Sequence, residues 1–405
     1  MVTHAERRRH SAAAAKIISF IKSNVVLVVA FLAAVITSCI VIPDEQYISY
    51  FDFKTLTCLF CTLAVICALK DISFFTIIAR RIVALTGDIR RAVITIVIIT
   101  FVGSMLIAND MALLTFLRLG YFVLKSSGQQ KYMFFTFIMQ NIGANLGGML
   151  TPFGNPQNLY LYNKFGIPTG EFMKIMAIPF VSAIALILIC CFIFVKKEKI
   201  TVQKDDEAHL PLWRTALYLA LFAFSIAIVF RSIPYYWGLV VIPAVLLIAD
   251  RSALQHVDYG LLMTFVCFFI FSGNMSRIEA VNHIISALLA KNTLLVSIAS
   301  CQFISNVPSA ILLSEFTENY RALLYGVNIG GTGYHSLACK PYNVQTVLCR
   351  RARRGKKVSA SLQRLQLCIS YHNDGDLLRA SLRKTPRYHR PIRKNDEEIF
   401  VVFSF

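Results

Sequence analysis

Residues 107–114 read IANDMALL and close one apolar segment of the chain, and residues 304–312 read ISNVPSAIL and close another. Each stretch places a small residue and an asparagine inside sequence that is apolar enough to lie in a lipid bilayer. Each is followed by a match that contains glycines, NIGANLGG at 141–148 and NIGGTG at 328–333. Polar, glycine-interrupted segments in corresponding positions of two halves mark the binding site of secondary transporters. The four stretches therefore predict a membrane carrier built from two related halves.

The composition of the whole chain also favours a membrane protein. The 405 residues are 56% hydrophobic and 16% charged, whereas soluble domains average about 45–50% apolar and ~25% charged residues. A helix needs about 20 mostly apolar residues to cross a bilayer. Apolar runs lie near 25–43, 54–69, 92–107, 132–150, 173–195, 212–230, 236–249, 258–273 and 293–304. We expect an all-α integral membrane fold with about nine to ten membrane segments, some of them tilted or broken.

The charges beside the apolar runs predict the topology. Residues 1–23 are basic, and the apolar run from Asn24 to Ile42 is too long for a cleaved signal peptide, so residues 24–48 are expected to stay as the first membrane helix. Loops rich in Lys and Arg remain in the cytoplasm. The N-terminus and the basic linker at 196–211 are therefore expected there. The prediction is a multi-pass protein of the plasma membrane with a cytoplasmic N-terminus.

Two transport repeats are expected on either side of the linker, at 49–195 and 212–333. In each, a helix leads to a polar break, and an amphipathic stretch, an apolar run and the asparagine-bearing segment follow. Apolar segments resemble one another easily, so the interpretation depends on the polar positions. Asn109 and Asn306 recur in the same order relative to the two NIG sequences, which indicates a structural repeat.

Residues 334–405 differ in character from the rest of the chain. They contain 15 Lys or Arg and five Asp or Glu, so they supply +10 of the formal net charge of +19. We expect this basic, non-membrane tail to come from a shifted reading frame, which would leave the second repeat incomplete. The alternative is a genuine cytoplasmic module that binds anionic lipid or nucleic acid, in a membrane-anchored regulator. The tail has no recognisable nucleic-acid-binding motif, so nucleic acid is not an expected partner.

Asn109 and Asp110 carry the candidate chemistry of the first half. Polar side chains in a membrane are costly unless they are paired or functional, and non-helical backbone at that depth must line a cavity or be buried in protein. We therefore place both residues at the tip of a re-entrant hairpin. Their oxygens and free backbone carbonyl groups can coordinate Na⁺, and free N–H groups at the start of a half-helix suit an anionic substrate.

Ser305, Asn306 and Ser309 offer the corresponding oxygens in the second half, and Pro308 is expected to break the helix there. The alternative is an ordinary helix-ending turn at the membrane surface. The match between Asn306 and Asn109 favours a binding site over that turn.

A polar, glycine-rich stretch follows the first hairpin. Gly148 and its neighbours let the backbone approach a ligand, and Thr151, Asn155 and Gln157 provide polar side chains. The glycines also fit close helix packing, and the polar residues also fit a loop outside the membrane. Metal-ligand spacing and a nucleophile–base set are both missing from the sequence, so we expect no cofactor, no metal centre and no enzymatic activity.

These motifs resemble the ion transporter superfamily that contains citrate and other di- and tricarboxylate transporters, arsenite permeases and one class of Na⁺/H⁺ antiporters. The resemblance covers roughly residues 20–333. Ala-Asn-Asp at 108–110 is similar to the first hairpin signature of the arsenite permease and antiporter branch, where the dicarboxylate branch has Ser-Asn-Thr. Ser-Asn-Val-Pro at 305–308 shares features with both, and Gly-Asn-Pro-Gln-Asn at 154–158 resembles the family's Gly-x-Pro-x-Asn segment.

The resemblance implies an all-helical inverted-repeat carrier with two re-entrant hairpins, whose substrate and cation meet near the membrane midplane. It also implies a homodimer that leaves the hairpins free to move. Position by position, the first half-site would contain Asn109, Asp110, Asn145, Gly148 and Asn155, and the second would contain Ser305, Asn306, Asn328, Gly330 and Gly331.

The expected function is uptake of a small anion, citrate or another di- or tricarboxylate, coupled to Na⁺ or H⁺ by alternating access. Arsenite export or Na⁺/H⁺ antiport on the same fold is the alternative, because a titratable carboxylate in the membrane, such as that of Asp110, can carry protons.

Overall fold

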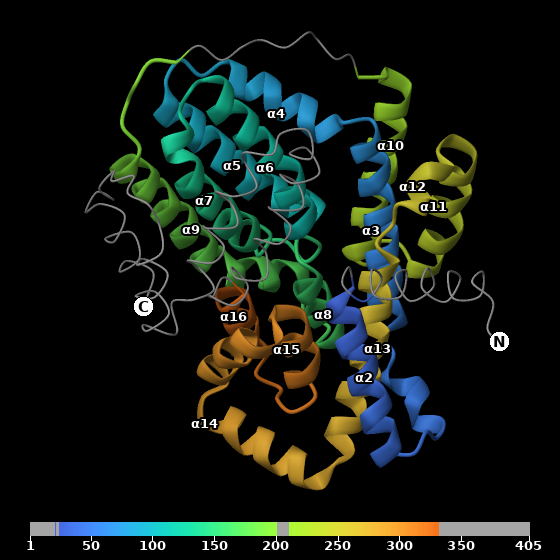
Figure 1. Ribbon diagram of the computed structural model, residues 1–405. Helices are drawn as coiled ribbons and strands as arrows, with labels where there is room; N and C mark the ends of the chain where they lie inside the picture. Colours follow the sequence, from blue (N-terminus) through green and yellow to red (C-terminus); the bar gives the residue numbers. More distant parts are fainter. Residues whose placement is uncertain (1–20, 22–23, 201–209, 332–405) are drawn as a thin grey trace, which may run out of the picture. The chain divides into compact units, whose positions relative to one another are not determined.

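The computed structural model describes residues 21, 24–200 and 210–331, and its named elements are helices (Figure 1). They are α2 (Val25–Ile40), the 3₁₀ helix η1 (Glu45–Tyr50), α3 (Phe53–Asp71), α4 (Phe74–Ala84), α5 (Ile89–Ile107), α6 (Asn109–Ser126), the 3₁₀ helix η2 (Gln130–Tyr132), α7 (Met133–Gly147), α8 (Pro156–Lys164), α9 (Thr169–Phe194), α10 (Leu212–Val229), α11 (Tyr235–Ala249), α12 (Arg251–Gln255), α13 (Tyr259–Arg277), α14 (Glu279–Ile304), α15 (Asn306–Leu313) and α16 (Tyr320–Gly330). The predicted basic tail and most of the basic N-terminus and of the linker lie outside the described residues.

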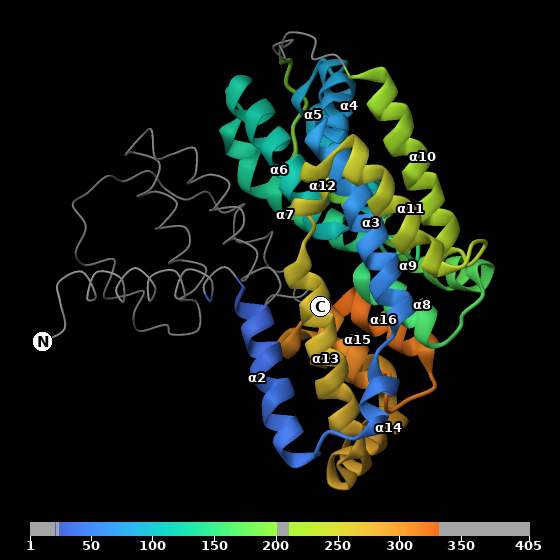
Figure 2. The same cartoon turned by 90° about the vertical axis from the view of Figure 1, so that its right-hand side faces the viewer.

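The helices pack in four sets, two of which combine helices from both halves of the sequence. One set contains α4, α5, α6, α7 and α9, in which α5 packs against α7 and α6. Helix α3 packs against α10, α11 and α12, and α2 lies along α13 in both views (Figures 1 and 2). Helices α14, α15 and α16 pack together. Helix α8 contacts α3, α15 and α16, so it connects the first half to the second.

The prediction of an all-α membrane protein is confirmed. Among the described residues, six helices are long and apolar enough to cross a membrane: α3, α5, α9, α10, α13 and α14. Each of the nine apolar runs in the sequence coincides with a helix. Ile178 and Ile193 of α9 and Ile248 of α11 are among the most exposed apolar side chains. Such faces suit contact with lipid.

The two halves contain helices in the same order. In the first half, α3, α4 and α5 lead to α6 and α7; in the second, α13 and α14 lead to α15 and α16. Helix α14 corresponds to both α4 and α5, because it is kinked at Asn292, where φ is −162° and ψ is 90°. The Asn292 Oδ1 accepts a hydrogen bond from the Leu295 N–H at 3.0 Å, as a helix N-cap does, so a new helical segment begins there.

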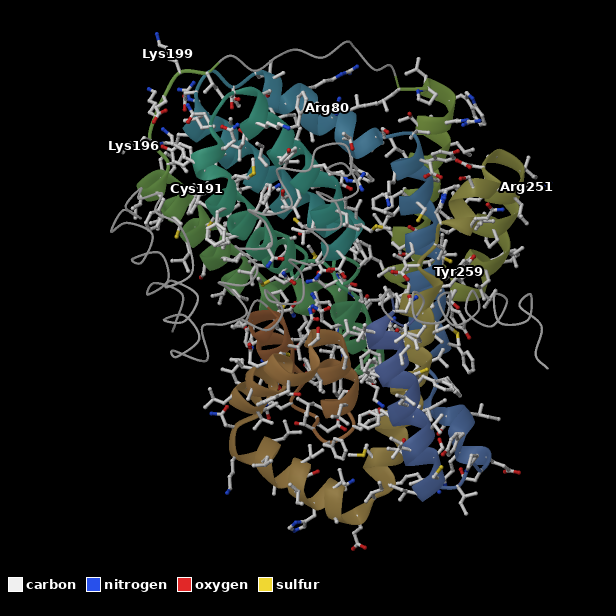
Figure 3. The ribbon with its side chains drawn as sticks, viewed as in Figure 1. Arg80, Cys191, Lys196, Lys199, Arg251 and Tyr259 are labelled. Atoms are coloured by element: carbon white, nitrogen blue, oxygen red, sulfur yellow. The ribbon has the colours of Figure 1, made fainter. Side chains whose placement is uncertain are left out.

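The start of the linker is hydrogen-bonded to the first half. The Ile89 N–H donates to the Glu198 carbonyl oxygen at 2.9 Å, and the Arg90 Nε donates to the Val195 carbonyl oxygen at 2.6 Å. Lys131 donates to Glu198 Oε1 at 2.6 Å. Figure 3 shows Lys196 and Lys199 at the same end of this part of the chain as Arg80 of α4. The beginning of the linker therefore connects the start of α5 to the α6–α7 connection.

Candidate functional site

Two helix breaks define the site. Ala108 separates α5 from α6 with φ 54° and ψ 149°, and Ser305 separates α14 from α15 with φ 72° and ψ 168°. This backbone region is strained for residues that carry a side chain. Two non-glycine residues thus adopt nearly the same rare conformation at corresponding points of the two halves. We call residues 107–111 the first tip and residues 304–308 the second tip.

The asparagine after each break satisfies an N–H group of the helix that begins there. Asn109 Oδ1 accepts from the Asp110 N–H at 2.8 Å, and Asn306 Oδ1 accepts from the Val307 N–H at 3.1 Å. Pro308, which was expected to break the helix, is instead the third residue of α15. Proline is tolerated in the first turn because its missing N–H would have no helical partner there. The break precedes the proline.

A buried set of amide side chains lies behind the first tip. Asn109 Nδ2 donates to Asn145 Oδ1 at 3.1 Å, and Asn155 Nδ2 donates to the Asn145 carbonyl oxygen at 3.1 Å. These three asparagines are buried. The bonds tie the start of α6, the end of α7 and the residue before α8 to one another.

Asn328 of α16 extends this network into the second half of the sequence. Its Oδ1 accepts from Gln157 Nε2 at 3.3 Å and from Asn155 Nδ2 at 3.4 Å. Its Nδ2 donates to Asn158 Oδ1 at 2.7 Å. All four side chains are buried, and hydrogen bonds in such surroundings are costly to lose. The interpretation of these residues as an exposed loop therefore does not fit the structure.

The glycines of the α7 end permit close approach of backbone and side chains. A Cβ atom at Gly147 would collide with the carbonyl oxygen of Phe101 in α5. A Cβ atom at Gly148 would collide with Asn155 Oδ1. Helix packing thus accounts for Gly147, and Gly148 makes room for the amide network.

Both tips open onto one cavity of about 360 Å³. The cavity is lined by Ala108, Asn109, Asp110, Met111 and Leu114, by Ser305, Asn306 and Val307, by Pro156, Gln157 and Gly331, and by Leu63, Lys70, His256, Asp258 and Leu261. Pockets of about 300–1,000 Å³ bind small molecules in proteins. Residues from both halves of the sequence therefore surround a space that a small molecule can occupy.

The cavity wall attracts charges of both signs. Helices α6, α8 and α15 each begin at the wall, and a helix N-terminus carries about half a positive charge. Lys70 adds an ammonium group. The carboxylates of Asp110 and Asp258 lie on the same wall, and Asp258 Oδ1 accepts from the Leu261 N–H at 2.9 Å. The wall therefore combines donors for an anion with hard oxygen ligands for a cation.

The structure brings most of the predicted site residues together. On the cavity lie Asn109, Asp110, Ser305, Asn306 and Gly331, and in the buried network behind it lie Asn145, Asn155 and Asn328. The remaining three predicted residues, Gly148, Thr151 and Gly330, neither line the cavity nor bond within that network.

Each of these three residues contacts a part of the fold other than the cavity wall. The Thr151 hydroxyl donates to the Met105 carbonyl oxygen at 3.2 Å, and a Cβ at Gly330 would lie 2.8 Å from the Cβ of Cys301. Gly148 faces the amide network, as described above. They position the site without forming its wall.

Sequence reasoning missed Lys70, His256 and Asp258 as lining residues. All three lie at or beside helix ends, outside the repeated motifs. The sequence signal for Lys70 was the charged pair Lys70-Asp71 at the end of an apolar run. Two charged residues at the end of a membrane helix are equally well explained by contact with water at the membrane surface.

The fold and the site define a class of protein: the chain is a multi-pass membrane transporter. It belongs to the citrate transporter family, whose model matches residues 14–325. The chain is 31% identical over 285 residues to an uncharacterized transporter of Methanocaldococcus jannaschii, and the match covers 70% of this chain and 77% of the relative. It is 29% identical over 269 residues to the inner membrane protein YbiR of Escherichia coli, covering 64% and 70% of the two chains.

Proposed function

We propose that the protein is a secondary active transporter that moves a small anion, citrate or another di- or tricarboxylate, across the plasma membrane by alternating access, with Na⁺ or H⁺ as the coupling ion. The observation that carries the proposal is the cavity onto which both tips open. Three helix N-termini at its wall suit an anionic substrate, and carboxylate and amide oxygens on the same wall suit a coupling cation.

The matched breaks at Ala108 and Ser305 support an inverted-repeat carrier with two re-entrant hairpins. In this proposal, α5–α6 and the second part of α14 with α15 are the hairpins, and residues 49–195 and 212–333 are the two transport repeats. The carbonyl ends of α5 and α14 at the breaks would contribute to cation binding. A cytoplasmic N-terminus and a homodimer belong to the same proposal.

The direct test is citrate uptake by the full-length chain in liposomes, under a Na⁺ gradient, a pH gradient or neither. We expect uptake under one of the gradients. Asn306→Ala should reduce it at least about tenfold, the equivalent of ~1.4 kcal/mol, because the variant loses an amide on the cavity wall that also bonds the first turn of α15. Asn282→Ala is the matched control, since Asn282 bonds the Ser276 carbonyl oxygen at 3.0 Å away from the cavity.

Uptake without either gradient, or equal loss in the two variants, would contradict coupled transport through this cavity. The first result would point to a passive pore. The second would show that any lost amide disturbs the protein.

The second candidate function is Na⁺/H⁺ antiport or arsenite export. It is favoured by one observation, the carboxylic acid of Asp110 on the cavity wall. Asp110→Asn removes the titratable group with little change in shape. Proton-coupled Na⁺ or arsenite movement that this variant abolishes, together with no citrate uptake in the unmodified protein, would establish the second function over the first.

A further inference from the structure

Lys70 has a position unlike the other residues of the cavity wall. It is the second-last residue of α3 and lies outside both tips. Its ammonium group contacts Met111 Sδ at 3.9 Å. Met111 is the third residue of α6, the helix that begins at the first tip. Lys70 therefore reaches toward the first turn of that helix from a neighbouring element.

The carboxylates of Asp71 and Asp258 have other partners. Asp71 Oδ2 lies 3.4 Å from His256 Nδ1 and accepts from Ser252 Oγ at 3.3 Å. Asp258 accepts from the first turn of α13, as described above. Within the described part of the chain, no ion pair involves Lys70. Its positive charge is therefore available to a molecule in the cavity.

Part of the wall is suited to the carbon skeleton of a substrate. Leu63, Leu114 and Leu261 line the same cavity, and apolar side chains there favour aliphatic groups over water. The wall thus offers anion-binding helix N-termini, an apolar surface and a separate ammonium group.

We propose that Lys70 binds a second anionic group of the substrate while the helix N-termini at the tips bind the first, so that the cavity selects anions with two or more carboxylates. This inference rests on the proposed function and adds a specificity-determining residue to it. An ammonium–carboxylate contact is a charge-assisted hydrogen bond, which is about twice as strong as a neutral one. A monocarboxylate can occupy only one of the two anion-binding positions.

The test compares citrate with acetate in liposomes that contain the full-length protein. Lys70→Met replaces the ammonium group with an apolar side chain that can still pack against Met111. We expect the citrate KM to rise at least about tenfold with a maximal rate within about twofold of the unmodified protein. The preference for citrate over acetate should fall by a similar factor, and Lys70→Arg should restore most of it.

Lys125→Met is the matched control. Lys125 is also a basic residue in the last turn of a helix, but it bonds Tyr121 at 3.1 Å and does not line the cavity. Thermal unfolding of all variants without citrate checks that they fold.

An unchanged citrate KM and preference in Lys70→Met, with uptake still lost in Asn306→Ala, would overturn the role of Lys70 and leave the proposed function intact. Absence of citrate uptake in the unmodified protein under both gradients would instead overturn the proposed function, and the role of Lys70 with it.

Discussion

Asn328 is the residue on which the buried network depends most. Three amide side chains bond it, and all belong to the segment before and within α8, far away in the sequence. Amide groups can donate and accept at once, which lets one side chain join several others. A single residue thus links the α7–α8 region to α16.

Replacing Asn328 with leucine should destabilise the protein by about 1–3 kcal/mol, because it leaves buried amide groups of α8 without their partner. Thermal or denaturant unfolding of the protein in detergent measures the change in the free energy of unfolding. Asn282→Leu serves as the comparison and should cost less than about 1 kcal/mol, since Asn282 is only partly buried. Equal losses of stability in the two variants would show that the buried network contributes no more to stability than a partly buried hydrogen bond.

At the scale of the helix, the contact between α5 and α7 is set by glycine. The backbone of Phe101 occupies the space that a side chain at Gly147 would need. We expect Gly147→Ala to destabilise the protein by about 3 kcal/mol or to prevent its folding. Gly170→Ala in α9 should have almost no effect, because among the described residues no atom beyond the local backbone lies within 4 Å of the added Cβ there. Size-exclusion profiles and melting temperatures distinguish the two, and a stable Gly147→Ala protein would contradict this packing.

A second prediction at this scale concerns Glu198, in the segment after α9. The hydrogen bond from Lys131, followed by that from Gln129, lowers the pKa of the Glu198 carboxyl from its usual 4.5. A carboxyl group whose pKa is lower in the folded state stabilises the fold at pH values above its unfolded-state pKa. This stabilisation is lost as the pH falls through the folded-state pKa. The melting temperature of the unmodified protein should therefore exceed that of Glu198→Gln at neutral pH, and the gap should close well below pH 4.5. A gap that persists in acid would contradict this role of the charge.

The helices were predictable to different degrees. Length and apolar composition were enough for the nine helices that coincide with apolar runs. Helix α6 was not among them, because its first turn contains Asn109 and Asp110, yet the repeated motif located its start. The kink of α14 at Asn292 could not be foreseen, since a single asparagine in an otherwise regular segment does not reveal whether it caps a new helix.

The candidate site was predictable only where chemistry and repetition coincided. Asn109 and Asn306 were identified because the motif occurs twice, and both lie on the cavity. Lys70 and His256 were not identified, because their approach to the first tip depends on how α3 and α12 pack. Contacts between distant elements are a property of the tertiary fold, which one sequence does not determine by pattern alone.

For the molecule as a whole, the basic segments predict the orientation in the membrane. Lys196 and Lys199 lie at the same end as Arg80 (Figure 3). Helix η1 begins at the exposed residue Glu45, in a stretch that contains Asp44 and Asp52 but no Lys or Arg, which favours the outside. Basic loops stay in the cytoplasm.

A cysteine at position 197 should therefore react with a membrane-impermeant maleimide only after lysis, and one at position 45 should react in intact cells. Both are introduced by Lys197→Cys and Glu45→Cys. The background lacks Cys39, Cys339, Cys349 and Cys368, and the remaining cysteines are buried. The reverse labelling pattern would invert the proposed topology.

The rare backbone conformation of Ala108 and Ser305 has a consequence for the whole transport cycle. Because the chain is folded with both helices already interrupted, an arriving ligand does not have to unwind them to reach their terminal amide groups. The site is preorganised, and the entropy lost on ordering the two tips is lost during folding. In the proposed alternating-access cycle, interaction with the ligand can then be directed to discriminating among solutes and to driving the conformational change.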